Sequence, residues 1–209
     1  MEHRYKFRIL PTLQQEQIIE DTFSGCAYLY NYFLTQQLER LRDSSPMDYY
    51  ECSAHLQKLL GEKEWMHALD PEALRDVVRE CVRDVHRYLQ AQASGRPAEL
   101  PKPRSHTDIR RSYRITTDSD AVIIGDGVVQ IPVLGTVAST VSRTTPLKVV
   151  SASIMQGFNT YYELAVHCTT RDRMADRSLA ICVGYFSPAE YMDRLRIRRR
   201  NETEGGGVK

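Results

Sequence analysis

The sequence predicts an α+β fold in which a small antiparallel β-barrel carries an inserted helical bundle, followed by the first strand of a further domain. Residues 5–10 alternate apolar and basic side chains, and residues 12–93 repeat apolar side chains at helical spacing. Residues 122–167 form short β-branched runs separated by turn residues. A single strand finds no partner among helices, so we expect residues 5–10 to pair with the later strands.

The first strand and the first helix meet at Pro11, which stops the strand because it cannot donate a ladder hydrogen bond. Thr12 and Gln15 have the spacing of a capping box at a helix start. The apolar stripe that follows comprises Ile19, Phe23, Cys26, Tyr30, Phe33, Leu34, Leu38 and Leu41. We expect Gly25 to break this helix and so to create a helix-turn-helix.

Two further helices complete the predicted bundle. The second follows Ser45 and Pro46, with an apolar stripe of Tyr49, Cys52, Leu56 and Leu59. The third starts at Asp70, a cap residue that precedes Pro71 at the first helical position. Its stripe comprises Leu74, Val77, Val78, Cys81, Val85, Tyr88 and Leu89. Residues 94–103 are rich in Gly, Pro and basic residues, which indicates an irregular connector.

A β region is predicted after the connector. Residues 122–124 and 128–133 flank the turn pair Asp126-Gly127 and so predict a hairpin. Residues 137–141, 147–155 and 161–167 supply further short strands, whose close spacing favours a small barrel. The expected boundaries are 1–11 for the first barrel strand, 12–95 for the helical insertion, 96–170 for the rest of the barrel and 171–209 for the next domain's start and a basic tail.

The composition is that of a folded chain. With 209 residues, 42% of them hydrophobic, it can bury a sizeable core. No apolar stretch approaches the roughly 18 residues of a membrane span, and the first residues lack the apolar core of a secretory signal. The five cysteines form no C-x-x-C pair, which favours reduced thiols, and no His, Cys or acidic cluster has metal-ligand spacing. We therefore expect a cytoplasmic protein without a membrane partner.

The net charge of +1 hides two basic segments. Residues 96–115 contain six basic against two acidic residues, and residues 171–209 contain nine against six, whereas residues 1–95 are acidic. Local clusters of positive charge attract phosphate even on a neutral chain, although many such clusters are simply solvated surface.

An ordered series of short motifs resembles the TnpB (OrfB) proteins that bacterial insertion sequences encode. Residues 5–12, Tyr-Lys-Phe-Arg-Ile-Leu-Pro-Thr, and residues 23–26, Phe-Ser-Gly-Cys, look like the opening of that family. Further similar motifs follow in the family's order at residues 64–66, 74–80, 100–104, 112–114 and 131–135. The resemblance covers roughly residues 4–186, and the order of the motifs is more specific than any one of them.

The resemblance implies an RNA-guided DNA endonuclease, ancestral to type V CRISPR effectors, in which a wedge barrel with an inserted recognition domain precedes a RuvC-like domain. In that family three carboxylates hold magnesium for cleavage. The first carboxylate lies on a strand that resembles residues 181–184, Ile-Cys-Val-Gly, where Cys182 stands in its place.

A thiolate is a poor ligand for magnesium, and the family's other two carboxylates would lie beyond Lys209. We therefore expect a truncated, nuclease-dead relative that is not an enzyme and needs no cofactor. Nucleic-acid binding is the function we expect to remain, in a repressor or accessory factor of the transposon.

Basic side chains suit phosphate, and a tyrosine among them suits stacking on a base. The candidate residues are Lys6, Arg8, Arg75, Arg79, Lys102, Arg104, Arg110, Arg111, Tyr113 and Arg114. The expected partner is guide RNA or DNA. Residues 179–186 predict an exposed apolar strand edge, which favours self-association or pairing with a full-length relative.

Two other interpretations stay open. The chain can be a decayed fragment of an insertion-sequence gene, because residues 191–209 are arginine-rich and resemble no continuation of a nuclease core. It can also be a stand-alone helix-turn-helix protein that reads a major groove with residues 26–41. That helix is rich in aromatic residues and lacks a basic residue before Arg40, which suits packing better than base recognition.

Overall fold

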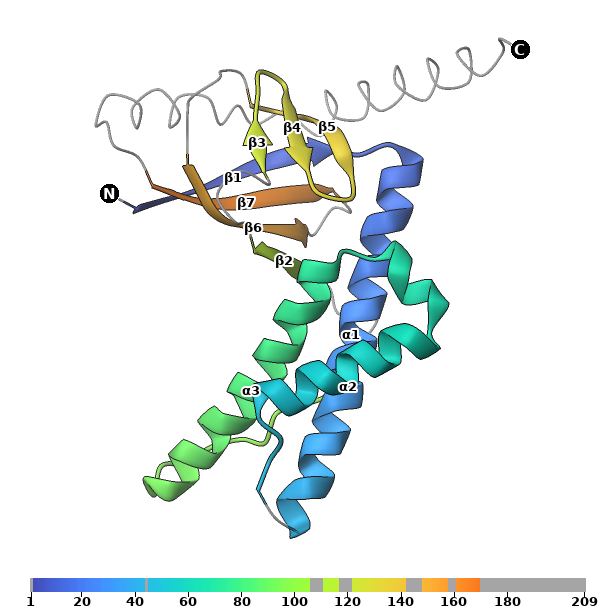
Figure 1. Ribbon diagram of the computed structural model, residues 1–209. Coiled ribbons are helices and arrows are strands. Elements are labelled where there is room, and N and C mark those ends of the chain that lie inside the picture. Colours follow the sequence, from blue (N-terminus) through green and yellow to red (C-terminus); the bar gives the residue numbers. More distant parts are fainter. Residues whose placement is uncertain are drawn as a thin grey trace.

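The computed structural model describes residues 2–43, 45–105, 111–116, 122–141, 148–157 and 161–169. Within this part, three α-helices lie below one seven-stranded antiparallel sheet in the view of Figure 1. The strand order is β2-β6-β7-β1-β5-β4-β3, and the outer strands β2 and β3 do not pair with each other. The α+β class is confirmed. The expected closed barrel is wrong for the described residues, because the edge strands β2 and β3 do not pair, and β3, with only two residues, is too short to close the sheet.

The first strand lies in the middle of the sheet. The strands are β1 (Glu2–Leu10), β2 (Ser112–Thr116), β3 (Ile123–Ile124), β4 (Val128–Ile131), β5 (Gly135–Ser139), β6 (Lys148–Gln156) and β7 (Tyr162–Thr169). β1 pairs with β7 from Glu2 to Ile9, and with β5 through Ile9 and Leu10. The prediction that this strand joins the later ones is confirmed, and the helices are inserted between β1 and β2.

Helix α1 (Leu13–Asp43) is continuous, so the predicted break at Gly25 is wrong. The capping box at its start is confirmed: Thr12 N–H donates to Oε1 of Gln15 (2.9 Å), and Gln15 N–H donates to Oγ1 of Thr12 (3.2 Å). Gly25 does not form a turn; its missing side chain leaves room for a neighbouring residue. A Cβ built at Gly25 would lie 2.3 Å from Cδ1 of Leu69, which therefore occupies that space.

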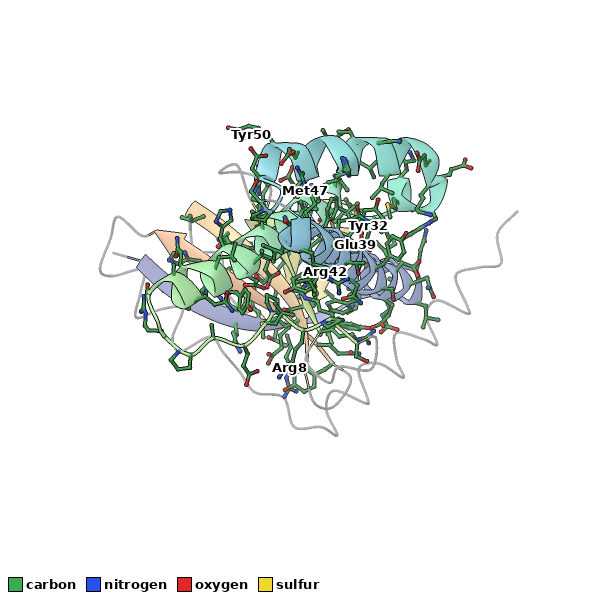
Figure 2. The ribbon with its side chains drawn as sticks, turned by 90° about the horizontal axis from the view of Figure 1, so that it is seen from below. Arg8, Tyr32, Glu39, Arg42, Met47 and Tyr50 are labelled. Carbon is green, nitrogen blue, oxygen red and sulfur yellow. The ribbon has the colours of Figure 1, made fainter. Side chains whose placement is uncertain are left out.

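The remaining helices are α2 (Tyr49–Glu62), the short 3₁₀ helix η1 (Glu64–Ala68) and α3 (Pro71–Ala93). Asp48 caps α2 in a capping box with Glu51. Asp70 caps α3, as predicted, by accepting hydrogen bonds from the backbone N–H groups of Glu72 and Ala73. In Figure 2, which views the molecule from below, Tyr50 of α2 lies at the opposite margin from Arg8 of β1.

One continuous cluster of buried apolar residues joins helices and sheet. Phe33 of α1, Leu74 of α3 and Ile154 of β6 are fully buried members. Strand β2 connects the two layers, because Tyr113 on this strand packs edge-on against Phe23 of α1 with ring centroids 5.4 Å apart. The helices therefore hold the β2 edge of the sheet, and this placement positions the site described next.

Candidate nucleic-acid interface

A shallow trough runs across the sheet, over strands β2, β6, β7 and β1. It encloses about 370 Å³. Its lining residues are Arg4, Tyr5, Lys6, Arg114, Ser151, Ser153, Ala165, Val166 and His167. We call this feature the sheet trough.

The pairing register explains why these side chains meet. Arg114 pairs with Ser153, Ser153 with Ala165, and Ala165 with Lys6, so these residues form one row across four strands. Directly paired residues in a sheet project to the same face. The middle of the row carries only small side chains, whereas a cation stands at each end. A second row joins Ser151 to His167 and His167 to Arg4.

The cations of the sheet trough are weakly engaged. Within the described residues, Arg4 and Arg114 are exposed and have no ion-pair partner, and Lys6 lies 3.9 Å from a carboxylate oxygen of Glu163. The Lys6 side chain is 60% exposed, so this pair contributes little stability. These groups are therefore available to an anionic partner.

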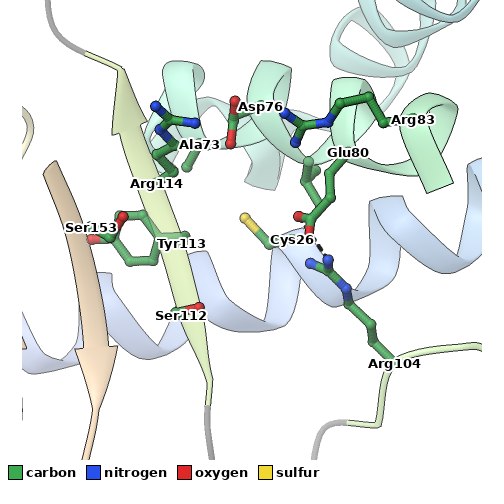
Figure 3. Close-up of a pocket in the computed structure, with 11 residues that line it drawn as sticks. Cys26, Ala73, Asp76, Glu80, Arg83, Arg104, Ser112, Tyr113, Arg114 and Ser153 are labelled. Carbon is green, nitrogen blue, oxygen red and sulfur yellow. Dashed lines mark ion pairs between the residues drawn. The ribbon is translucent and has the colours of Figure 1, made fainter. Parts of the chain in front are cut away.

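A second, smaller pocket adjoins the sheet trough where α3 passes β2 (Figure 3). It encloses about 230 Å³ and shares Arg114 and Ser153 with the trough. Its other lining residues are Cys26, Ala73, Asp76, Val77, Glu80, Arg83, Arg104, Ser112 and Tyr113. Burial raises the pKa of the Cys26 thiol to about 12, so this thiol is not a nucleophile at neutral pH. We call this feature the α3–β2 pocket.

Arg104, predicted to contact nucleic acid, is held by the helices. Its Nη2 lies 2.7 Å from Oε2 of Glu80, and its guanidinium stacks 4.0 Å from the ring centroid of Tyr30. Its backbone N–H donates to Oδ1 of Asn31 (2.7 Å), and its carbonyl accepts from Nδ2 of Asn31 (2.9 Å). These contacts fasten the end of the connector to α1 and α3.

Arg111 has a similar position at the start of β2. Its Nη1 lies 2.7 Å from Oε2 of Glu20 on α1, and its Nε and Nη2 donate to Oε1 of Gln156 (3.0 and 2.6 Å). Tyr162 of β7 donates its hydroxyl to Glu20 (2.8 Å). Burial, and then this hydrogen bond, raise the pKa of Tyr162. The network joins α1 to three strands.

Tyr113 is only 5% exposed, and burial raises its pKa well above the ordinary value. Its ring packs against Phe23, which leaves little of its surface for a base, and its role in stacking stays a prediction. The strand alternation explains this burial, because Tyr113 and Ile115 point into the core whereas Arg114 between them is exposed.

The other predicted cations are dispersed. Arg75 pairs with Glu72, and Arg79 lies 3.9 Å from Asp76 with its guanidinium 5.3 Å from the ring centroid of Tyr49. Lys102 lies 2.7 Å from Glu99. Arg8 stands over the ring of Tyr161 at 4.3 Å. Among the predicted residues that the structure describes, only Lys6 and Arg114 line the sheet trough.

Several expectations concern residues outside the described part. Arg110, Cys182 and the region 171–209, with its expected strand edge, all lie there. Among the residues that the structure does describe, no three His, Cys, Asp or Glu side chains gather to hold a metal ion. None of the described helices combines the length and apolar character needed to cross a membrane.

Sequence reasoning missed Arg4, His167 and Arg83. Arg4 continues the period-two pattern of Lys6 and Arg8, so the signal was present in the strand. Arg83 follows Asp76 and Glu80 along one face of α3, but nothing in the sequence shows that this face meets β2.

Comparison with known families gives one match. Residues 1–44 match the model of the helix-turn-helix domain of OrfB proteins from IS605 elements. No curated protein matches the chain. The family match supports a transposon-related, DNA-binding protein. In this structure the described residues of the matched segment form β1 and the continuous helix α1.

Proposed function

We propose that this protein binds the guide RNA or the DNA of an insertion-sequence element through the sheet trough, and that it does not cleave the nucleic acid. The observation that carries the proposal is the row of Arg114, Ser153, Ala165 and Lys6, which places cations on both sides of a floor of small residues. The match of residues 1–44 to an OrfB domain favours the same class of partner.

The dimensions of the row suit a polynucleotide backbone. Neighbouring strands lie about 4.8 Å apart, so three strand intervals separate the backbones at Lys6 and Arg114 by roughly 14 Å. Serine hydroxyls between them can donate to phosphate oxygens, and cations bind phosphates regardless of sequence. In the middle of this row, Ser153 and Ala165 carry no long side chain that would keep a nucleic-acid strand from the sheet.

The thiol of Cys182 supports the proposed loss of cleavage. By the resemblance to TnpB proteins, this residue stands where the first metal-binding carboxylate of the nuclease is found. Magnesium prefers hard oxygen ligands, so a thiol there would not replace that carboxylate.

Fluorescence anisotropy with a structured RNA and a DNA duplex tests the proposal. We expect R4A/K6A/R114A to weaken binding, and to reduce the slope of log K against log salt by about 2 to 3, since each released phosphate contact contributes about 0.7 to 0.9. These residues are better targets than Arg104 and Arg111, which hold the fold together.

A matched control removes exposed cations far from the trough. Lys58 on α2 and Arg87 on α3 are largely exposed, and in the described part of the chain each pairs only with a neighbour on its own helix. If K58A/R87A weakens binding as much as the trough variant, or if neither RNA nor DNA binds, the sheet trough is not the interface. Cleavage of the DNA in magnesium above a no-protein control would refute the nuclease-dead assignment.

A further inference from the structure

The α3–β2 pocket contains a buried carboxylate with unused hydrogen-bonding capacity. Asp76 is 9% exposed, and its nearest cation, Nη1 of Arg79, lies 3.9 Å from Oδ1, beyond hydrogen-bond distance. Within the described residues the Asp76 side chain makes no hydrogen bond, and this long ion pair with Arg79 is its one charged contact. Its oxygens still reach solvent, because the side chain is 12% exposed, so donors of a ligand that enters the pocket can replace water on this carboxylate.

Two arginines stand near this carboxylate. In Figure 3 the Asp76 carboxylate is seen between the guanidiniums of Arg83 and Arg114, and all three residues line the same pocket. Within the described residues neither Arg83 nor Arg114 has an ion-pair partner. Glu80 and Arg104, the remaining charged pair, already contact each other at 2.7 Å. The charged groups left for a ligand are therefore the acceptor Asp76 and the donors Arg83 and Arg114.

The lining also defines the shape of a ligand. Ala73, Val77, Cys26 and Tyr113 supply apolar surface, whereas the charged groups supply a polar side. A volume of about 230 Å³ is below the roughly 300 to 1,000 Å³ of pockets for drug-sized ligands. A flat heteroaromatic base with polar edges fits this description.

We infer that the α3–β2 pocket binds one unpaired guanine base. A carboxylate only accepts hydrogen bonds, and guanine presents two adjacent donors, N1–H and the N2 amino group. Its other edge presents the acceptors O6 and N7, which a guanidinium recognises. On the Watson–Crick edge of adenine, cytosine and uracil, each donor has an acceptor beside it. None of these bases therefore supplies two adjacent donors to Asp76.

The neighbouring trough indicates how the base arrives. Arg114 and Ser153 line both cavities, so a strand in the sheet trough passes the mouth of the α3–β2 pocket. The base must be unpaired, because its Watson–Crick edge faces Asp76. In this respect the inference rests on the proposed function, since the trough holds the strand that carries the guanine.

The test measures binding of short oligouridines that carry one central guanosine, inosine, adenosine or 7-deazaguanosine. Inosine lacks the N2 amino group, and 7-deazaguanosine lacks the N7 acceptor. We expect guanosine to bind about tenfold more tightly than inosine, the range of one bidentate contact. Oligothymidines with deoxyguanosine or deoxyinosine show whether the site prefers RNA or DNA.

Two variants assign the contacts. Asp76→Asn should abolish the preference for guanosine over inosine, and Arg83→Gln should abolish the preference over 7-deazaguanosine, while both bind plain oligouridine like the wild type. Glu72→Gln, a change at a partly exposed acid of α3 outside the pocket, is the matched control and should keep both preferences.

The outcomes separate the two proposals. Equal binding of all four oligouridines by the wild type overturns the guanine pocket and leaves nucleic-acid binding intact. Absence of binding by every oligonucleotide overturns both. A guanosine preference that persists in Asp76→Asn overturns the assignment to this pocket.

Discussion

Nη1 of Arg111 lies 2.7 Å from Oε2 of Glu20, and this ion pair joins the start of β2 to the first third of α1. The same guanidinium donates to Gln156 of β6, and Glu20 also accepts from Tyr162 of β7. The helical layer is therefore attached to the sheet by a polar network as well as by the apolar core.

Removal of this guanidinium should destabilise the fold. Arg111→Ala leaves Oε1 of Gln156 without its donor and the partly buried Glu20 without its cation, so we expect the free energy of unfolding to fall by about 1–3 kcal/mol. Urea denaturation measures the change. The matched control is Arg87→Ala, which removes an exposed pair with Asp84 and should change stability by less than about 1 kcal/mol. Equal effects of the two variants would show that the network is not stabilising.

Two helical glycines should respond differently to alanine. A Cβ at Gly61 in α2 meets nothing within 4 Å, so Gly61→Ala should raise stability by up to about 1 kcal/mol through helix propensity. At Gly25 the new Cβ would lie 2.3 Å from Cδ1 of the buried Leu69, so Gly25→Ala should be less stable than Gly61→Ala. Thermal melts of both variants compare them, and a larger gain at Gly25 would contradict the close packing.

The cap of α3 should make stability depend on pH. Burial raises the pKa of Asp70, and one of its carboxylate oxygens is buried with no partner among the described residues. A carboxyl with a raised folded-state pKa stabilises the fold most below its unfolded pKa, and this contribution falls as pH rises through the folded value.

Asp70→Ala should therefore cost more stability near pH 4 than at pH 7, where the lost cap costs about 1 kcal/mol. Urea titrations of the variant and the wild type at both pH values give the difference. A cost that grows with rising pH would show that the ionised carboxylate is favoured in the folded state.

The buried cysteines should resist thiol reagents. Burial raises the pKa to about 12 for Cys26 and Cys81, and to about 11 for Cys52 and Cys168. In a Cys182→Ser variant we expect no fast reaction with a disulfide reagent at pH 8, and four reactive thiols after denaturation. Fast native labelling of any of the four would show that its site opens.

The local patterns predicted elements well where neighbours in the chain decide the structure. The Thr12–Gln15 and Asp70 caps and the strand alternation of β1 depend on side chains a few residues apart. Gly25 shows the limit. The low helix propensity of glycine favours a break in the helix, but Leu69 fills the space beside Gly25. The residues near Gly25 in the sequence do not show that a residue 44 positions later packs there.

The candidate site was predicted only in part, for a similar reason. Alternation in β1 identified Lys6, and a basic segment identified Arg114, both of which line the sheet trough. The same segment could not show that Arg104 and Arg111 pair with Glu80 and Glu20, since a charge count does not reveal distant acidic partners. Cross-strand register, which assembles the trough, emerges only when the strands are paired.

The central place of β1 has a consequence for synthesis of the chain. Lys6 pairs with Ala165, so the first described strand, β1, waits during synthesis for the last described strand, β7. At about 5–20 residues per second, this delay is roughly 8 to 30 seconds. During that interval the apolar face of β1, with Phe7 and Ile9, lacks its main neighbour. A nascent chain of this protein is thus a natural client for chaperones, and its yield should depend on how long translation pauses before β7.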